Sequence, residues 1–594
     1  MKIAVNNFLL VIFSDDEKHI IEEVTSNIQK SYNILQHRFV VKVNNYSVLS
    51  MYRKEVLSIG NQVIIYNGII PNPELCKKFS IDALKYYDFQ AAIAFIDENS
   101  DRILVVRDSF GTRAVFYTCL IPRNLFIISS DLELIRKMLE MLGIELHTDI
   151  IALYEFMING YISRNRTLFK EIKKLEAGQY LELLINNKVQ FTTAYYWNPE
   201  FEIKSDNNSY RVSELIDALF DNLYIKNIPK DENVGLYFSG GLDTTLITSA
   251  LLSIPIYSSK IFNLISVYFR EDPRDLNYIS RALHDLKKIM DYDKLKRVLI
   301  HEVSLNKYLS IYLNLLRKHL RNLGLPSQGD AALPYLLVAH IANRYNPRYM
   351  VTGDGGDGLF GGYDMDVAFL LDSLMSLRIT EAIKVFRNIK RSKKIVIGQL
   401  VHYMLDLFPS LKYYYIRRKL IKIASKNLAQ KKKIVNLISH YISRTHLVNL
   451  SNGYTLFKRM LFKYLKYKLP LLALTNTKAH EYFGIALMFP FLTRKIVRAV
   501  LQLNDRVFFL PLGSRSIQRI ILKIIGFSPE IYMQSKVGFS TTDYVLRSSL
   551  LNVMKHKIMR SPIATKYFNL CDVSNKLELL NLYNAIMLIE DEEH

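Results

Sequence analysis

The stretch Val-Gly-Leu-Tyr-Phe-Ser-Gly-Gly-Leu-Asp-Thr-Thr at residues 234–245 decides how this chain folds. An apolar run typical of a strand leads into two adjacent glycines, and a helix-compatible run follows from Leu246. This order places backbone N–H groups and a helix N-terminus around an anion, as phosphate-binding loops do. Asp243 adds an oxygen ligand that suits Mg²⁺. No Lys follows the glycines, so the loop is not a Walker A loop. An ordinary glycine-rich turn is the alternative.

Two more motifs lie downstream of this loop. Residues 349–363 read Tyr-Met-Val-Thr-Gly-Asp-Gly-Gly-Asp-Gly-Leu-Phe-Gly-Gly-Tyr, again an apolar segment that enters a loop rich in glycine and carboxylate. Asp354 and Asp357 are three positions apart and can serve one site. Residues 534–540, Gln-Ser-Lys-Val-Gly-Phe-Ser, supply Lys536 near a glycine. Glycine at this density costs conformational entropy, which indicates backbone that must approach a ligand closely.

The three motifs, in this order and spacing, resemble the asparagine synthetase family, whose superfamily also holds β-lactam synthetase and the lasso-peptide cyclases. Segments of the amino-terminal third, Tyr-Asn-Gly at 66–68 and Val-Arg-Asp-Ser-Phe-Gly-Thr-Arg at 106–113, resemble the glutaminase-type domain of that family. The resemblance implies an α/β protein of two domains. An N-terminal-nucleophile-type α/β-sandwich is expected in residues 1–200. A parallel-sheet domain of the adenine-nucleotide α-hydrolase (PP-loop) type with added helices is expected in residues 210–594.

The resemblance also implies a site in which ATP is split into AMP and pyrophosphate. Mg²⁺ would be bound by Asp243 and Asp357, because this ion commonly takes one or two carboxylates plus phosphate oxygens. Lys536 would stabilise charge in the transition states, and Asp354 occupies the place of a carboxylate that accepts a proton from the attacking amine. The positions that correspond to nucleotide contacts in the family are Phe238, Ser239, Gly240, Gly241, Asp243, Thr244, Val267, Thr352 and Gly353.

Several positions depart from the family pattern. A working glutaminase of this type needs a cysteine exposed at the N-terminus after Met removal, whereas position 2 is Lys2, and Ile69 stands where a Glu binds glutamine. Glutamine hydrolysis is therefore not expected. An acidic residue of the second loop is replaced by Gly358, a Ser-Leu-Glu-x-Arg segment reads Gly-Ile-Ala-Leu-Met at 484–488, and a final Asp is Thr493. These changes remove charges from the acceptor side of the site.

Composition sets the remaining expectations. The 594 residues exceed what one hydrophobic core usually serves. Three cysteines without a regular spacing argue against a disulfide framework and suit a reducing cytoplasm. The net charge of +22 is concentrated between residues 384 and 433, where basic and apolar residues alternate with a helical period. Solvated helix faces are the simplest interpretation, with an anionic partner as the alternative. Neither a nucleic-acid nor a membrane partner is expected, and the resemblance is compatible with a homodimer.

Three functions stay open at this point. The first is an ATP-dependent amide ligase that makes asparagine from aspartate and free ammonia. The second is a ligase that joins another carboxylate to an amine, closing a lactam or a peptide macrocycle. The specific β-lactam synthetase mechanism is disfavoured, since it would need Tyr in place of Asp354 and Glu in place of Ala486. The third is a paralogue that binds nucleotide without catalysis. The retained loops and both carboxylates favour an enzyme, with aspartate or a related carboxylate as its substrate.

Overall fold

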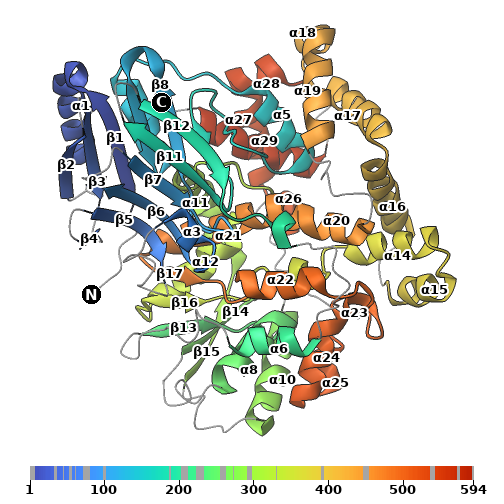
Figure 1. Cartoon of the computed structure of the whole chain (residues 1–594). Helices are drawn as coiled ribbons and strands as arrows, with labels where there is room; N and C mark the ends of the chain where they lie inside the picture. Colours follow the sequence, from blue (N-terminus) through green and yellow to red (C-terminus); the bar gives the residue numbers. More distant parts are fainter. Residues whose placement is uncertain are drawn as a thin grey trace.

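The structure, a computed structural model, describes most of the chain (Figure 1). The described residues are 7–31, 37–43, 46–52, 56–59, 62–70, 80–97, 102–185, 189–202, 212–221, 233–253, 263–271, 273–289, 297–329, 331–389, 393–445, 454–534, 542–570 and 575–590.

Two antiparallel sheets of six strands each form the amino-terminal part. The first sheet has the order β10-β8-β9-β1-β3-β2, built from β1 (Phe8–Ser14), β2 (His37–Val43), β3 (Tyr46–Tyr52), β8 (Phe116–Leu120), β9 (Leu125–Ser129) and β10 (Lys173–Lys174). The second has the order β12-β11-β7-β6-β5-β4, built from β4 (Val56–Ile59), β5 (Gln62–Ile69), β6 (Gln90–Asp97), β7 (Arg102–Arg107), β11 (Gln179–Ile185) and β12 (Val189–Tyr195).

The side chains of β1 show how these sheets pack. Leu10 and Ile12 point into one buried cluster, which they share with Val63 and Ile65 of the second sheet. Alternate residues such as Val11 enter a different cluster, under the helices α1 (Lys18–Ser31) and α4 (Leu132–Met141). This alternation is the two-residue period of a strand that is buried on both faces. The predicted α/β-sandwich is therefore confirmed.

A parallel sheet of five strands follows in the order β15-β14-β13-β16-β17. Its strands are β13 (Val234–Tyr237), β14 (Asn263–Phe269), β15 (Arg297–Val303), β16 (Tyr349–Val351) and β17 (Ala486–Met488). The chain adds β14 on one side of β13 and β16 on the other. Such a reversal of strand order opens a crevice at the carboxyl ends of the strands, where ligands bind in open α/β sheets. The predicted parallel-sheet domain is confirmed, and both glycine-rich loops leave β13 and β16 at this crevice.

Helices surround the parallel sheet and extend the domain (Figure 1). Those near the sheet are α6 (Val212–Phe220), α8 (Leu242–Ser253), α10 (Arg274–Ile289), α11 (Leu305–Leu323), α12 (Ala332–Asn343), α13 (Gly356–Leu359), α21 (Leu469–Glu481), α22 (Arg494–Gln502), α24 (Ser516–Ile525) and α25 (Pro529–Tyr532). Farther out lie α14 (Met365–Met375), α15 (Ile379–Asn388), α16 (Lys393–Leu407), α17 (Pro409–Ile423), α18 (Lys426–Ala429), α19 (Lys432–Thr445), α20 (Leu456–Lys463), α23 (Arg506–Phe509), α26 (Thr542–Arg547), α27 (Leu550–Arg560), α28 (Pro562–Tyr567) and α29 (Lys576–Ile589).

The largest buried cluster joins the two parts of the molecule. It includes outward-facing residues of the second antiparallel sheet, such as Ile93 and Val106, together with Leu236 and Val351 of the parallel sheet. The division into domains at residues 1–200 and 210–594 stays a prediction, since this core is continuous. Among the described residues, no helix is long and apolar enough to cross a membrane.

Candidate active site

The loop after β13 has the geometry of a phosphate-binding turn. Gly240 adopts φ +69°, and a Cβ there would meet the carbonyl oxygen of Tyr278 at 2.4 Å, so only glycine fits. The Oγ of Ser239 and the Oγ1 of Thr244 lie 3.1 Å apart, and the Gly241 N–H donates to Ser239 Oγ at 3.3 Å. These bonds hold the turn against the first residues of α8. Its N–H groups and hydroxyls can therefore converge on an anion.

The crevice between β13 and β16 contains a cleft of about 440 Å³, a size in the range of small-ligand sites. Ten of the twelve predicted site residues line this cleft: Phe238, Ser239, Gly241, Asp243, Thr244, Val267, Thr352, Gly353, Asp354 and Asp357. Gly240 supports the cleft from behind, because its carbonyl accepts a hydrogen bond from Gln534 Nε2 at 2.9 Å. Lys536 lies outside the described residues, two positions beyond Gln534. Its role stays a prediction.

The two carboxylates predicted to bind Mg²⁺ meet at a single guanidinium. Nη1 of Arg515 lies 2.9 Å from Asp243 Oδ2 and also donates to Asp357 Oδ1. Gln518 Nε2 donates to the other oxygen of Asp243 at 2.7 Å. Gly356 permits this approach, since a Cβ there would come within 2.2 Å of Asp243 Oδ1. Two loops separated by more than a hundred residues thus present their carboxylates to one point.

The donor set fits a magnesium ion shared with phosphate oxygens. Among the described residues, no group of three or more His, Cys, Asp or Glu side chains could hold a metal by itself. Asp243 and Asp357 supply two hard oxygen donors, and Mg²⁺ in nucleotide sites typically takes one or two carboxylates and completes its shell with phosphate and water. Bound there, the ion would neutralise pyrophosphate charge. Because Arg515 Nη1 bonds both carboxylates, the ion and the guanidinium would share them.

Asp354 lies in the same loop as Asp357 but has different hydrogen-bond partners. Burial raises the pKa of its carboxyl to about 6, while a hydrogen bond from Asn476 Nδ2 acts in the opposite direction and the charges of Asp357 and Asp243 add to the increase. A carboxyl group with a pKa near the working pH is suited to accept and return a proton. The raised pKa is compatible with a general-base role for Asp354, which stays a prediction.

A buried histidine fixes the helix that carries Asn476. His480 lies one turn further along α21, and its Nδ1 lies 2.9 Å from the carbonyl oxygen of Asn476. Its Nε2 lies 2.5 Å from the hydroxyl of Tyr237, which lines the cleft. Burial lowers the pKa of His480 to about 4, so the ring is neutral. With Nδ1 donating to the carbonyl, Nε2 accepts from the tyrosine, which positions its ring.

The same helix enters the boundary with the antiparallel sheets. Glu481 Oε1 lies 2.9 Å from Arg113 Nε, and Glu481 Oε2 lies 3.1 Å from Lys478 Nζ. All three side chains are at most 4% exposed. Lys478 also reaches Asn7 Oδ1 at 3.4 Å, and Arg113 Nη1 donates to Thr477 Oγ1 at 3.1 Å. Helix α21 thus connects the acceptor side of the cleft to the amino-terminal sandwich through buried charges.

Sequence reasoning missed Arg515, Gln518, Asn476 and the pair Tyr237–His480. Arg515 adopts φ +61° at the start of α24, a conformation that is uncommon for a residue with a side chain and often occurs at functional sites. The sequence signal for Arg515 was weak and consisted of a helix-compatible run from residue 514 that begins with polar residues. Asn476 and His480 occur in a mostly buried helix whose sequence gives no sign that Asn476 lines a cleft and that His480 contacts a lining tyrosine.

The departures from the family pattern have local structural causes. A Cβ at Gly358 would lie 2.2 Å from ring carbons of Tyr464, so a tyrosine ring occupies the space an acidic side chain would need. The segment at 484–488 contains β17, whose three residues are buried beside β16. Thr493 caps α22 by accepting from the Ile496 N–H at 3.2 Å. Lys2 lies outside the described residues.

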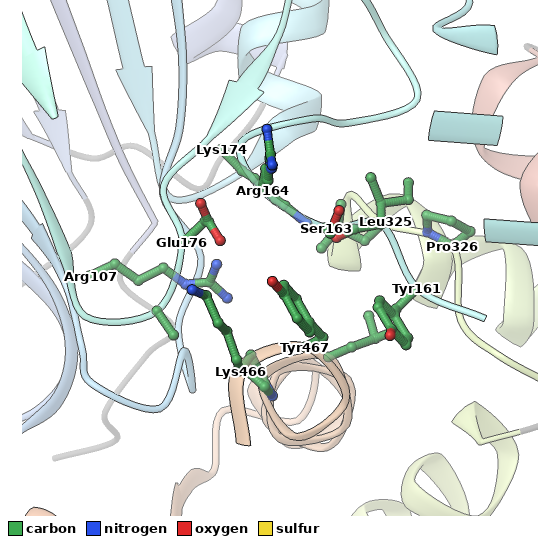
Figure 2. A pocket seen from close by; sticks show the side chains of 14 residues that line it. Arg107, Tyr161, Ser163, Arg164, Lys174, Glu176, Leu325, Pro326, Lys466 and Tyr467 are labelled. Atoms are coloured by element: carbon green, nitrogen blue, oxygen red, sulfur yellow. Dashed lines mark hydrogen bonds between the residues drawn. The ribbon is translucent and has the colours of Figure 1, made fainter. Parts of the chain in front are cut away.

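A second, much smaller cavity lies between the sandwich and the helical region (Figure 2). It measures about 40 Å³, enough for a few waters but not for a nucleotide. Burial lowers the pKa of Lys174 to about 8 and that of Arg107 to about 10. Lys174 Nζ donates to the Ile162 carbonyl at 2.6 Å, and Arg107 donates to three backbone carbonyls. These cations brace the backbone, so the larger cleft is the candidate active site.

Comparisons with known proteins agree with this fold and identify the family of the chain. The family described as asparagine synthase matches residues 216–585, more than half of the chain, and a glutamine amidotransferase domain family matches residues 73–197. The chain therefore belongs to the asparagine synthase family.

Individual relatives are distant. A putative asparagine synthetase (glutamine-hydrolyzing) 2 of Methanocaldococcus jannaschii is 26% identical over 336 residues, 53% of this chain and 61% of the relative. Asparagine synthetase (glutamine-hydrolyzing) 1 of Bacillus subtilis is 26% identical over 345 residues, 55% of this chain and 51% of the relative. This chain thus spans about half to three-fifths of these relatives. A solved glutamine phosphoribosylpyrophosphate amidotransferase from B. subtilis covers 39% of this chain and 60% of its own at 9% identity, but the TM-score of 0.21 supports nothing further.

Proposed function

We propose that this protein is an ATP-dependent carbon–nitrogen ligase that activates a carboxylate as an acyl-adenylate and transfers the acyl group to ammonia or an amine. The observation that carries the proposal is the convergence of Asp243 and Asp357 beside the glycine-rich turn, with a second, differently tuned carboxyl group at Asp354 in the same cleft.

The phosphate half of the cleft would hold ATP and direct where it is split. N–H groups of the turn and the hydroxyls of Ser239 and Thr244 bind the β- and γ-phosphates, while Phe238, Val267, Thr352 and Gly353 contact the nucleoside. The substrate carboxylate attacks the α-phosphorus, and pyrophosphate leaves with its charge held in the turn. Mg²⁺ bound by Asp243 and Asp357 would supply charge neutralisation. Lys536 is proposed to stabilise the negative charge of both transition states.

The acceptor half would complete the amide. Asp354, ionised above its pKa of about 6, removes a proton from the attacking amine, and AMP departs from the acyl carbon. Asn476 orients the carboxylate by its hydrogen bond. Aspartate with ammonia is the first substrate pair to test, because the matched family and its relatives are named for the synthesis of asparagine.

The nitrogen source is proposed to be ammonia or an amine and not glutamine. Lys2 stands in place of the required cysteine, and Ile69 in place of the glutamate that binds glutamine. A second candidate, formation of a lactam or a peptide macrocycle with an internal amine, is favoured by this loss of ammonia supply and by the uncharged segment at 484–488. A cytoplasmic location fits the few cysteines.

The test is an ATP–pyrophosphate exchange assay with Mg²⁺ across aspartate and a panel of carboxylates, with and without ammonia. AMP and pyrophosphate are the expected products, and exchange should depend on the carboxylate but not on the amine. ADP as the only nucleotide product would refute the proposal. In a parallel reaction with glutamine, glutamate release by the pure chain would overturn the assignment of the nitrogen source alone.

A further inference from the structure

One stretch of the chain carries most of its excess positive charge. From Arg378 to Lys433 there are 16 Lys and Arg residues and only two acidic ones, Glu381 and Asp406, which amounts to +14 of the net +22. The structure places this stretch on α15, α16, α17 and the helices that follow, along the outer edge of the molecule and away from the antiparallel sheets (Figure 1). We call the described residues 379–389 and 393–423 the outer arm.

The outer arm also exposes apolar side chains in a regular pattern. Ile379, Ile383 and Phe386 on α15 and Ile397, Val401 and Met404 on α16 occur at positions i, i+4 and i+7, and each is between 46% and 59% exposed. On α17 the exposed positions Leu411, Tyr414, Arg418 and Ile421 follow the same helical period. Such spacing puts each set on one face of its helix.

These exposed faces are not the faces that form the core. On α16, Val396 and Tyr403 are buried, and on α17 Ile416 and Leu420 are buried. Of the 32 large apolar side chains that are exposed among the described residues, 16 lie between residues 374 and 437, about a ninth of the chain. Solvated helix faces account for the lysines and arginines here but not for an outward apolar stripe on three successive helices. Exposed large apolar side chains gathered in one region of a protein and accompanied by charged residues mark an interaction site.

Charge and chemistry select the partner. A second copy of this chain would bring one strongly basic arm against another, which is unfavourable. Nucleic acid would bind the positive charge. Its recognition through phosphate contacts and base stacking, however, leaves the exposed Ile, Val and Met side chains without an apolar partner. An anionic lipid surface uses both features, because apolar side chains enter the acyl boundary while Lys and Arg extend to the headgroups.

We propose that the outer arm docks the protein onto an anionic lipid bilayer, with the apolar stripes of α15, α16 and α17 in the interface and the flanking basic residues on the headgroups. This differs from the sequence-based expectation of no membrane partner. The proposed ligase activity is not a premise of the inference. In a cytoplasmic setting, the inner leaflet supplies the negative surface potential.

Flotation of the full-length chain with lipid vesicles tests this inference. At 0.1 M NaCl the chain should float with vesicles of phosphatidylcholine and phosphatidylglycerol, and it should stay in the unbound fraction with phosphatidylcholine alone. The variant Ile397→Ser/Val401→Ser/Met404→Ser should bind at least about tenfold more weakly, because the apolar insertion is removed. The variant Lys394→Gln/Arg418→Gln/Lys422→Gln should lose on the order of 100-fold, at about fivefold for each charge.

Matched controls come from exposed positions elsewhere in the molecule. Ile121→Ser/Ile524→Ser/Met559→Ser removes three apolar side chains that are more exposed than those of the arm variant, and Lys288→Gln/Lys523→Gln/Lys555→Gln removes three exposed lysines. Both controls should float like the unchanged chain. Thermal unfolding of every variant shows whether it is folded, and the arm positions are exposed enough that the midpoint should shift little.

Four outcomes would overturn the proposal. The first is that the chain fails to float with anionic vesicles, and the second is that the arm variants float as well as the controls. Light scattering shows a dimer that the stripe variant dissociates, which would assign the arm to a second copy. Single-stranded RNA binds with losses in the charge variant but none in the stripe variant, while vesicle binding is absent, which would assign it to nucleic acid.

Discussion

The phosphate half of the cleft is built by two short loops at the ends of adjacent strands, whereas the acceptor half depends on a helix that also enters the domain boundary. In the first half, glycines bring Asp243 and Asp357 to a common point beside Arg515. In the second half, Asp354 meets Asn476, which is positioned by α21 and by the network of Tyr237 and His480. The predicted motifs supply both carboxylates of the first half, but a helix from a distant part of the chain completes each half: α24 brings Arg515 to the first and α21 brings Asn476 to the second.

The largest effect is expected from Asp243→Asn. This change removes the carboxylate that is proposed to hold Mg²⁺ and that bonds Arg515 and Gln518, so both pyrophosphate exchange and amide formation should fall by at least about 10³-fold. Exchange kinetics and Mg-ATP titration measure the loss. Asp82→Asn, at an exposed site far from the cleft, is the control. If Asp243→Asn exchanged pyrophosphate near the original rate, the role proposed for Asp243 in the phosphate half would be wrong.

Arg515→Gln should lower both partial reactions by roughly 10²–10³-fold, because it leaves two neighbouring carboxylates without their buried counter-charge. Arg515→Lys should recover only part of the activity, since the shorter lysine side chain does not carry its ammonium to the point where Arg515 Nη1 meets both carboxylates. Arg506→Gln, at an exposed arginine paired with Glu381, is the matched control. If Arg515→Gln slows amide formation but not exchange, Arg515 belongs functionally to the acceptor half.

Asp354→Asn should separate the two halves. Amide formation is expected to fall about 10²-fold, because the proton acceptor is lost, while exchange with the carboxylate substrate continues. Measurement of both rates on one preparation makes the contrast direct. Equal losses in the two rates would contradict a division of labour within the cleft.

The smallest effect is a shift in pH dependence. Asp354 must be ionised to accept a proton, and its pKa is about 6, so amide formation should rise with pH through 6 and level off above 7. Asn476→Leu removes a hydrogen bond that lowers this pKa, so the rising limb should move to higher pH. The rate should fall several-fold at pH 6 and change little at pH 8. A profile that keeps its midpoint would show that Asn476 does not act through Asp354.

The sequence was informative where a function depends on neighbouring residues in the chain. The two glycine-rich loops and the order of strand and helix around them were predictable, since a tight phosphate turn needs glycine at fixed offsets. The pairing of Asp243 with Asp357 was expected from the family resemblance, and the structure brings the two carboxylates together at Arg515. Arg515 and Asn476 were not, because their role depends on α24 and α21 meeting loops more than a hundred residues away. The charge of the outer arm was visible in the sequence, but its exposed apolar stripes were not, since helical period alone does not tell which of two apolar faces is buried.

The ion pairs at the end of α21 connect the amino-terminal sandwich to the helix beside the cleft, whether or not the sandwich hydrolyses glutamine. Cutting the chain after the sandwich would take Arg113 away from Glu481 and Asn7 away from Lys478, and it would leave the remaining Lys478–Glu481 pair at a newly solvent-exposed surface. The helix that would loosen is the one that holds Asn476. An evolutionary exchange of the sandwich for another domain would have to preserve these charged contacts. The two domains are therefore expected to be inherited together.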